Sequence, residues 1–151
     1  MNKLLLLLAT AGSAAMLLGA FGFQYIGDMA PCKMCIWQRW PHGIAIVAGL
    51  LALALKQKVF AIIGALAALT TSLIGLYHAG VEKGLFEGPD SCTSGPVGNL
   101  SADELFNQIM SAPLVRCDEI PWDMFGISMA GWNGLISFTL FGLWVLALRR
   151  D

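Results

Sequence analysis

Residues 59–81 read VFAIIGALAALTTSLIGLYHAGV and contain no charged side chain. A helix needs about 20 predominantly apolar residues, at about 1.5 Å of rise each, to cross a hydrocarbon core about 30 Å thick. Residues 4–27 and 124–148 are uncharged stretches of comparable length. These three stretches therefore predict three membrane-spanning helices.

A fourth uncharged stretch, residues 40–55, is shorter. To span the membrane, its helix has to begin upstream, near Cys35 or Ile36, which draws Arg39 into the outer edge of the bilayer. A charged side chain at that depth is a first indication of a functional site. We therefore expect an all-α membrane protein with a single domain, residues 1–151. Its four-helix transmembrane bundle is predicted to have spans at about 4–26, 36–55, 59–81 and 124–148, with outer loops at 27–35 and 82–123.

The composition agrees with a membrane protein. Of the 151 residues, 57% are hydrophobic and 13% are charged, whereas ordinary globular domains have about 45–50% apolar and about 25% charged residues. The net charge of -1 shows no basic excess that would indicate a nucleic-acid partner. The first span also has features of a cleaved signal peptide, but it exceeds the roughly 7–15 apolar residues of such peptides, so we expect a retained helix.

The loop charges predict an orientation. One side of the bundle carries five basic residues and one acid, namely Lys3, Lys56, Lys58, Arg149, Arg150 and Asp151. The two loops on the other side carry four basic residues and nine acids. The positive-inside rule therefore places both termini in the cytoplasm and the two longer loops outside, in a periplasm.

The four cysteines all belong to the outer loops. Cys32 and Cys35 lie in the first loop, and Cys92 and Cys117 lie in the second. Two spans separate the loops, so all four cysteines share one side of the membrane whichever way the bundle is inserted. An outward location favours disulfides over free thiols.

Three interpretations compete for the motif Cys32-Lys33-Met34-Cys35: a structural disulfide, a zinc site completed by Cys92 and Cys117, and a redox pair. The second pair is not a C-x-x-C motif and has no close histidine, which counts against a zinc site. A helix that begins near Cys35 places this sulfur at a positive helix end, and Arg39 follows one turn later. Both features favour a thiolate at Cys35, and a thiolate is the nucleophile of disulfide exchange. The alternative for Arg39 is that its side chain only reaches out to the lipid headgroups.

The segment P-C-K-M-C-I-W-Q-R, residues 31–39, resembles the C-x-x-C-x-x-Q-R signature of the DsbB family of membrane proteins for disulfide bond formation. The similarity extends over the chain: four spans, a separated cysteine pair in the long second loop, and residues 122–129, which resemble the family's W-x-x-F-G-[IL]-S-M segment. A vitamin K epoxide reductase shares this chemistry, but its separated pair typically precedes its C-x-x-C motif.

The resemblance implies a thiol:quinone oxidoreductase of the bacterial inner membrane that reoxidises a periplasmic DsbA-type thioredoxin-fold oxidase. By order along the chain, the partner's thiolate would attack Cys92, and the released Cys117 would attack Cys32. Cys35 would then be the thiolate that faces the quinone, which is ubiquinone or menaquinone. The rival hypothesis is a non-enzymatic membrane protein whose cysteines bind zinc or form structural disulfides.

The resemblance also implies roles for two further residues. Arg39 would stabilise the Cys35 thiolate and donate a hydrogen bond to a quinone carbonyl. His78 falls where the family often has a histidine in contact with the quinone ring, although a lone histidine in an apolar stretch is otherwise a packing residue. Gln38 stays unassigned, as cap or quinone contact, and we expect no metal ligand.

The long loop contains one predicted helix. Ser101 and Glu104 have capping-box spacing, and an apolar stripe follows at Leu105, Phe106, Ile109 and Met110. We expect this helix to end before Pro113 and to lie on the outer leaflet, with packing on the bundle's own loops as the alternative.

Overall fold

The computed structural model describes residues 1–93, 101–111 and 115–149, so Pro113, Arg150 and Asp151 lie outside the described residues. The described part contains five helices and one two-stranded ribbon. In chain order these are α1 (Lys3–Tyr25), α2 (Lys33–Leu55), α3 (Lys58–Glu82), α4 (Ala102–Ser111), β1 (Asp123–Met124), β2 (Ile127–Ser128) and α5 (Met129–Arg149).

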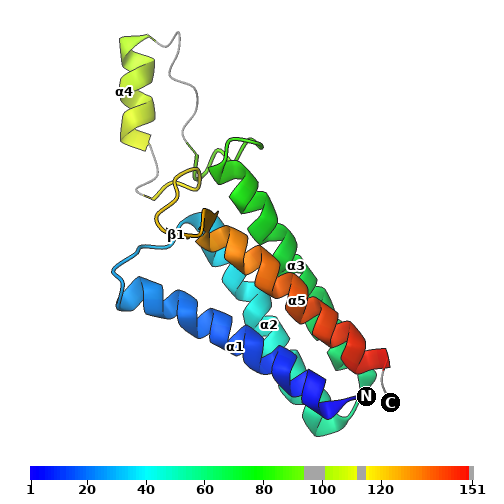
Figure 1. Cartoon of the computed structure of the whole chain (residues 1–151). Coiled ribbons are helices and arrows are strands. Elements are labelled where there is room, and N and C mark those ends of the chain that lie inside the picture. Colours follow the sequence, from blue (N-terminus) through cyan, green and yellow to red (C-terminus); the bar gives the residue numbers. More distant parts are fainter. Residues whose placement is uncertain (94–100, 112–114, 150–151) are drawn as a thin grey trace.

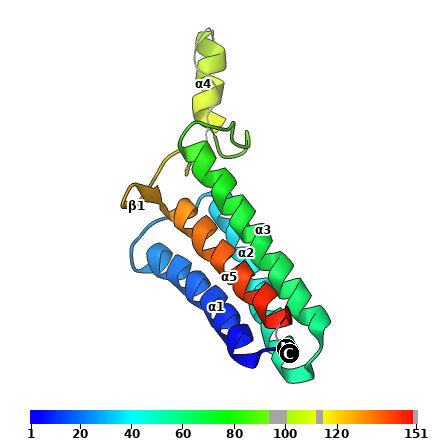
Figure 2. The same ribbon diagram turned by 45° about the vertical axis from the view of Figure 1, so that its right-hand side comes forward.

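The four long helices pack side by side into one bundle, with both termini at the same end (Figures 1 and 2). In this bundle α3 packs against α2 and α5, and α1 contacts both α2 and α5. Three helices, α1, α3 and α5, are long and apolar enough to cross a membrane. The predicted helical class is confirmed, and α2, which carries Lys33 and Arg39, lies among these three helices as the fourth member of the bundle.

Two helix starts differ from the sequence prediction. Helix α2 begins at Lys33, three residues before the predicted start, because Cys32 serves as its N-cap. The predicted start of the last span at residue 124 is wrong, since β1 and β2 form an antiparallel hairpin before α5 begins. The two turn residues, Phe125 and Gly126, both have positive φ, 55° and 74°. That backbone is typical of a two-residue hairpin turn.

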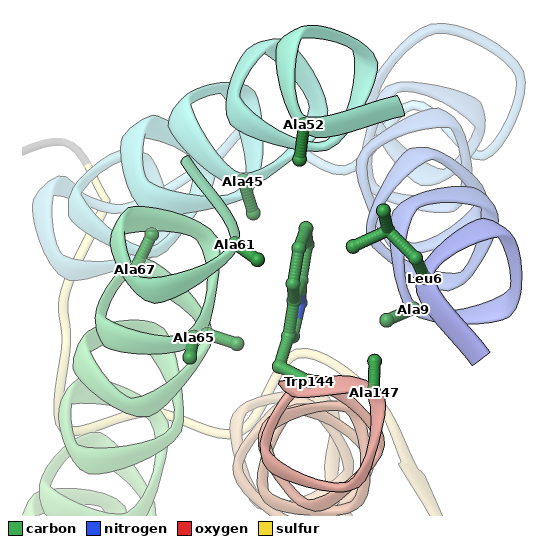
Figure 3. Packing of buried hydrophobic residues seen from close by; sticks show 10 residues of the cluster. Leu6, Ala9, Ala45, Ala52, Ala61, Ala65, Ala67, Trp144 and Ala147 are labelled. Atoms are coloured by element: carbon green, nitrogen blue, oxygen red, sulfur yellow. The ribbon is translucent and has the colours of Figure 1, made fainter. Parts of the chain in front are cut away.

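Trp144 occupies the centre of the bundle at the end that holds the termini (Figure 3). Its fully buried ring lies among small side chains and one leucine: Leu6, Ala9, Ala45, Ala52, Ala61, Ala65, Ala67, Ala68 and Ala147. Alanines from all four long helices surround this one large ring, and their small side chains let the helices approach each other closely around it.

Helices α3 and α5 approach each other closely at a pair of glycines. A Cβ atom at Gly75 would lie 2.8 Å from Gly134 N and 2.9 Å from Ala130 O. Ser72 Oγ donates to Gly134 O at 2.8 Å across the same contact. This close approach sets which faces of α3 and α5 meet.

The predicted capping box of α4 is confirmed. Ser101 N donates to Glu104 Oε2 at 2.8 Å, and Glu104 N donates to Ser101 Oγ at 3.3 Å. The apolar stripe is exposed, with relative exposures of 63% for Phe106, 63% for Ile109 and 71% for Met110. Among the described residues, packing of this stripe on the bundle's own loops is therefore not observed, and its placement on a membrane leaflet stays a prediction.

Candidate functional site

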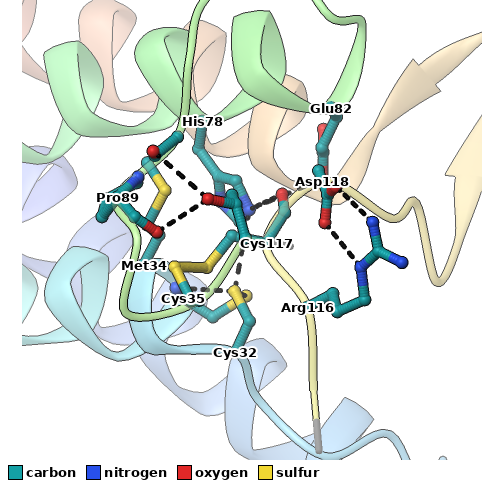
Figure 4. Close-up of a disulfide and its surroundings, with 12 residues drawn as sticks. Cys32, Met34, Cys35, His78, Glu82, Pro89, Arg116, Cys117 and Asp118 are labelled. Atoms are coloured by element: carbon teal, nitrogen blue, oxygen red, sulfur yellow. Dashed lines mark hydrogen bonds and ion pairs between the residues drawn. A yellow bond between two sulfur atoms is a disulfide. The ribbon is translucent and has the colours of Figure 1, made fainter. Parts of the chain in front are cut away.

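The start of α2, which carries Cys32 and Cys35, lies at the end of the bundle opposite the termini (Figure 1), and Figure 4 shows both of them close to Cys117. Cys32, Cys92 and Cys117 belong to one buried cluster with Met34 and Val81, and Cys35 packs against it. Cys92 and Cys117 form a disulfide. Cys32 and Cys35 are free thiols, and their Sγ atoms lie 2.7 Å apart. A dithiol therefore lies beside a disulfide, as any exchange between the two pairs requires.

Cys32 caps the helix that carries Cys35. The Cys35 backbone amide donates to Cys32 Sγ at 3.2 Å, so the sulfur takes the place of the usual oxygen cap. The hydrogen bond with Cys35, together with burial, raises the pKa of the Cys32 thiol well above its ordinary value.

The disulfide is closed to solvent. Cys92 and Cys117 are 1% and 0% exposed, and Cys117 N donates to Cys92 O at 2.7 Å. Arg116, next to Cys117 in the chain, donates a hydrogen bond to Asp118, and this bond holds the pKa of the Asp118 carboxyl below its ordinary value. A thiolate from another protein can reach Cys92 only after this end of the molecule opens.

His78 lies at the cysteines. Its Nε2 atom is 3.6 Å from Cys32 Sγ and 3.2 Å from Cys117 O, and its Nδ1 atom is 2.9 Å from Gln38 Nε2. Glu82 Oε1 lies 3.8 Å from the same Nε2 atom. Glu82 is a site residue that the sequence reasoning missed, although its i, i+4 spacing from His78 places both on one face of α3.

Arg39 makes its hydrogen bonds with α1. Its guanidinium donates to Gln24 Oε1 and to Ala20 O, both on α1, and lies 5.2 Å from the centre of the Phe21 ring. These contacts tie Arg39 to α1, while Arg39 and Cys35 line the same cavity, so the predicted stabilisation of a Cys35 thiolate by Arg39 stays a prediction. The predicted hydrogen bond to a quinone carbonyl stays a prediction.

A cavity of about 400 Å³ opens beside the cysteines. Apolar side chains from α1, the loops and α5 form most of its wall, among them Met16, Phe23, Trp122, Trp132 and Ile136. The polar part of the wall consists of Cys32, Cys35, Gln38, Arg39, His42, His78, Glu82, Arg116, Glu119 and Asn133. The reactive sulfurs, a guanidinium and a histidine thus face one mainly apolar cavity.

Buried polar side chains extend from the cysteines into the bundle, which the sequence reasoning also missed. Asn133 Nδ2 donates to Gln38 Oε1 at 2.7 Å and to Thr71 Oγ1 at 3.1 Å. His42 Nε2 lies 2.9 Å from Asn133 Oδ1. The only signal for these contacts in the sequence is the presence of polar side chains inside apolar stretches, which does not say which of them meet.

The rival zinc site does not match this arrangement. Four cysteine ligands require four free thiolates, whereas Cys92 and Cys117 are joined to each other. Cys32, Cys35 and His78 do bring three ligand atoms within 4.8 Å of one another.

Comparison with known proteins identifies the family. The family model for disulfide bond formation protein DsbB matches residues 2–147. The chain belongs to the DsbB family. A disulfide bond formation protein B 2 of Pseudomonas aeruginosa is 30% identical over 155 residues, covering 98% of this chain and 90% of its own. A disulfide bond formation protein B of a Shewanella strain is 30% identical over 132 residues, which cover 83% of this chain and 75% of the relative.

A third relative is an uncharacterized protein of Rickettsia prowazekii, 29% identical over 126 residues, with coverage of 80% of this chain and 73% of the relative. Membership of the DsbB family, together with three helices that are long and apolar enough to span, makes the chain a multi-pass membrane protein of disulfide bond formation. Its cysteine cluster is the redox centre of this disulfide-forming oxidoreductase.

Proposed function

We propose that this DsbB-family protein is a thiol:quinone oxidoreductase that reoxidises a periplasmic DsbA-type dithiol oxidase. The observation that carries the proposal is the Cys32, Cys35 dithiol, which lies between the Cys92–Cys117 disulfide on one side and a mainly apolar cavity on the other. Electrons that enter at the disulfide need only one exchange to reach the sulfur at the cavity.

The exchange steps balance. The partner's two thiols become a disulfide while the Cys92–Cys117 disulfide is reduced to two thiols. Cys117, as thiolate, then attacks Cys32 in an oxidised Cys32–Cys35 pair and displaces Cys35, and Cys92 closes the outer disulfide again. The result is the arrangement described above, with an outer disulfide and an inner dithiol.

The cavity residues fit a quinone. The apolar wall would bury the ring and the first part of its tail, Arg39 offers N–H groups for a ring oxygen beside Cys35, and His78 lines the same cavity. When bound, a quinone accepts two electrons and two protons, which the two thiols supply as the Cys32–Cys35 disulfide re-forms. Ubiquinone and menaquinone both meet this requirement.

The acceptor has to be oxidising enough to take electrons from a DsbA-type oxidase, and we expect a membrane quinone to meet this requirement. A DsbA-type oxidase has a reduction potential of about -120 mV, so a couple near -200 mV, such as glutathione, cannot reoxidise it. Because the quinone is dissolved in the membrane, we expect the chain in the bacterial inner membrane with all four long helices spanning it. The positive-inside rule then places both termini in the cytoplasm and the cysteines on the periplasmic side.

The test is a coupled assay with the purified full chain in lipid nanodiscs. Reduced DsbA-type oxidase and a short-tailed ubiquinone are added, and quinone absorbance is followed. We expect quinone reduction in proportion to the thiol oxidised, and its loss in Cys35→Ala. Lys33→Ala is the control, because Lys33 is exposed in the first turn of the same helix. No quinone consumption, or full activity in Cys35→Ala, would overturn the proposal and favour structural disulfides.

A further inference from the structure

A chain of buried hydrogen bonds leads from the middle of the bundle to the cysteines. It begins at Thr71 on α3, crosses to Asn133 on α5 and Gln38 on α2, and ends at His78 on α3. All four side chains are buried. Uncompensated polar groups in a membrane bundle are costly, so the direction of each hydrogen bond is strongly constrained.

The direction is set at Thr71. Its hydroxyl donates to the Gln38 backbone carbonyl at 3.0 Å. The hydroxyl oxygen is thus left as an acceptor, and it takes a hydrogen bond from Asn133 Nδ2 at 3.1 Å. The amide nitrogen of Asn133 therefore faces Thr71 and Gln38, and its oxygen accepts from His42 Nε2 at 2.9 Å.

Gln38 transmits this direction to His78. Its Oε1 atom accepts from Asn133, so its NH₂ group turns toward Met34 O at 3.2 Å and His78 Nδ1 at 2.9 Å. An amide NH₂ can only donate, so His78 Nδ1 presents a lone pair and the ring proton is on Nε2. The groups that face Nε2 agree, because Cys117 O at 3.2 Å and Glu82 Oε1 at 3.8 Å are both acceptors.

We propose that Gln38 and Asn133 are positioning residues that hold His78 in its Nε2–H tautomer, so that this N–H stabilises the thiolate of Cys32, 3.6 Å away. The functional part of this inference rests on the proposed thiol:quinone chemistry. His78 then acts on the cysteine as a neutral hydrogen-bond donor and gives up no proton.

Cys32 is the sulfur for which such a donor matters. The hydrogen bond with Cys35 and burial raise the pKa of its thiol, so its deprotonation is costly. When the inner disulfide re-forms, Cys32 loses its proton, its sulfur bonds to the sulfur of Cys35, and two electrons and the two thiol protons pass to the quinone. A hydrogen bond to the thiolate of Cys32 lowers the cost of the deprotonation.

The same tautomer opposes a metal ion at Cys32, Cys35 and His78. A metal on Nε2 needs the ring proton on Nδ1, where an acceptor usually holds it. Gln38 presents a donor there. The hydrogen-bond directions thus favour redox chemistry over zinc at this cluster.

The experiment reads the tautomer directly. The chain has two histidines, so ¹⁵N-histidine NMR of the full chain in nanodiscs reports His42 and His78, and His42→Gln assigns them. We expect both wild-type rings to carry the proton on Nε2. In Gln38→Glu, at a pH where the carboxylate is ionised, His78 moves its proton to Nδ1 while His42 does not. A wild-type His78 with its proton on Nδ1 overturns the proposal, whatever the variant does.

Activity provides the second readout. In Gln38→Glu, the rate at which the dithiol enzyme reduces quinone should fall about tenfold or more, as for loss of a hydrogen bond to a charged group, with a smaller change in quinone KM. Ser137→Ala is the control, because Ser137 donates to Asn133 Oδ1 at 3.3 Å on the side away from Gln38. An unchanged rate with a changed tautomer would overturn the role. No quinone reduction by the wild type would instead refute the proposed function and leave the tautomer result standing.

Discussion

Arg39 shows how one residue joins structure and chemistry. Its guanidinium hydrogen bonds with two oxygens of α1 and lies over the ring of Phe21, while its own helix carries Cys35 one turn earlier. The planar fork can hold two acceptors at fixed angles, which a lysine cannot. Arg39 therefore determines where the α1 wall of the cavity stands relative to the cysteines.

Arg39→Lys should weaken quinone reduction more than thiol exchange with the partner. We expect about a tenfold loss of kcat/KM for quinone, because a lysine keeps the charge but loses one of the two charge-assisted bonds. Stopped-flow measurement of the two half-reactions separates the effects. Arg149→Lys, at the opposite end of the bundle, is the control. Equal losses in both half-reactions would show that Arg39 acts on the thiols or on folding alone.

At the scale of elements, the contact between α3 and α5 depends on glycine. Neither Gly75 nor Gly134 has a side chain to separate the two backbones, and a Cβ at Gly75 would meet backbone atoms, which cannot move aside as a flexible side chain does. The same pair of helices carries Thr71 and Asn133, so the close approach also brings the polar chain together.

Gly75→Ala should destabilise the bundle by about 1–3 kcal/mol, the usual cost of overpacking a well-packed core. The measurement is reversible unfolding in mixed detergent and SDS. Gly142→Ala is the matched control on α5, since a Cβ there meets nothing within 4 Å. Similar unfolding free energies for the two variants would contradict the close approach.

The first turn of α4 should depend on pH. Hydrogen bonds from Ser101 hold the pKa of Glu104 below its ordinary value. A depressed folded pKa means that the stabilisation is fully present above the ordinary glutamate pKa and is lost as the pH falls through the depressed value. Amide hydrogen exchange of residues 102–105, corrected for intrinsic rates, should lose protection over that acidic range. In Glu104→Gln the pH dependence should disappear, and if it persists, another group is responsible.

For the whole molecule, the notable property is that the outer disulfide is buried, although the proposed function requires a protein partner to reach it. The bundle buries it with Val81 and Met34 in one cluster with the inner cysteines. A small reductant can therefore reach the disulfide only when the cysteine cluster opens spontaneously, whereas a partner can use binding energy to open it.

Val81→Ala should speed reduction of the Cys92–Cys117 disulfide by glutathione about fivefold. The variant loses buried packing contacts around the disulfide, which lowers the free energy needed for local opening. Thiol trapping and mass spectrometry give the rate. Val59→Ala, an exposed position on the same helix, should leave the rate unchanged. Reduction of the wild type at the rate of a fully exposed disulfide would contradict the buried arrangement.

Features that depend only on nearby residues of the chain could be predicted from the sequence. An uncharged run such as residues 59–81 has to be a helix of that length in a membrane, and the capping box at Ser101 and Glu104 needs only its own backbone. The hairpin before α5 escaped prediction because Phe125 is an unusual residue for a positive φ. The start of α2 was missed because a cysteine, Cys32, replaces the usual cap.

Hydropathy and short motifs were enough to predict that helices form, roughly where they lie, that the cysteines share one side and which family the pattern resembles. The fold was needed to show that Gln38, His78 and Asn133 meet, that Arg39 reaches α1 and that Glu82 joins the site. Those contacts depend on how each helix is rotated and how closely glycines let the backbones approach. Neither quantity can be read from a single stretch of sequence.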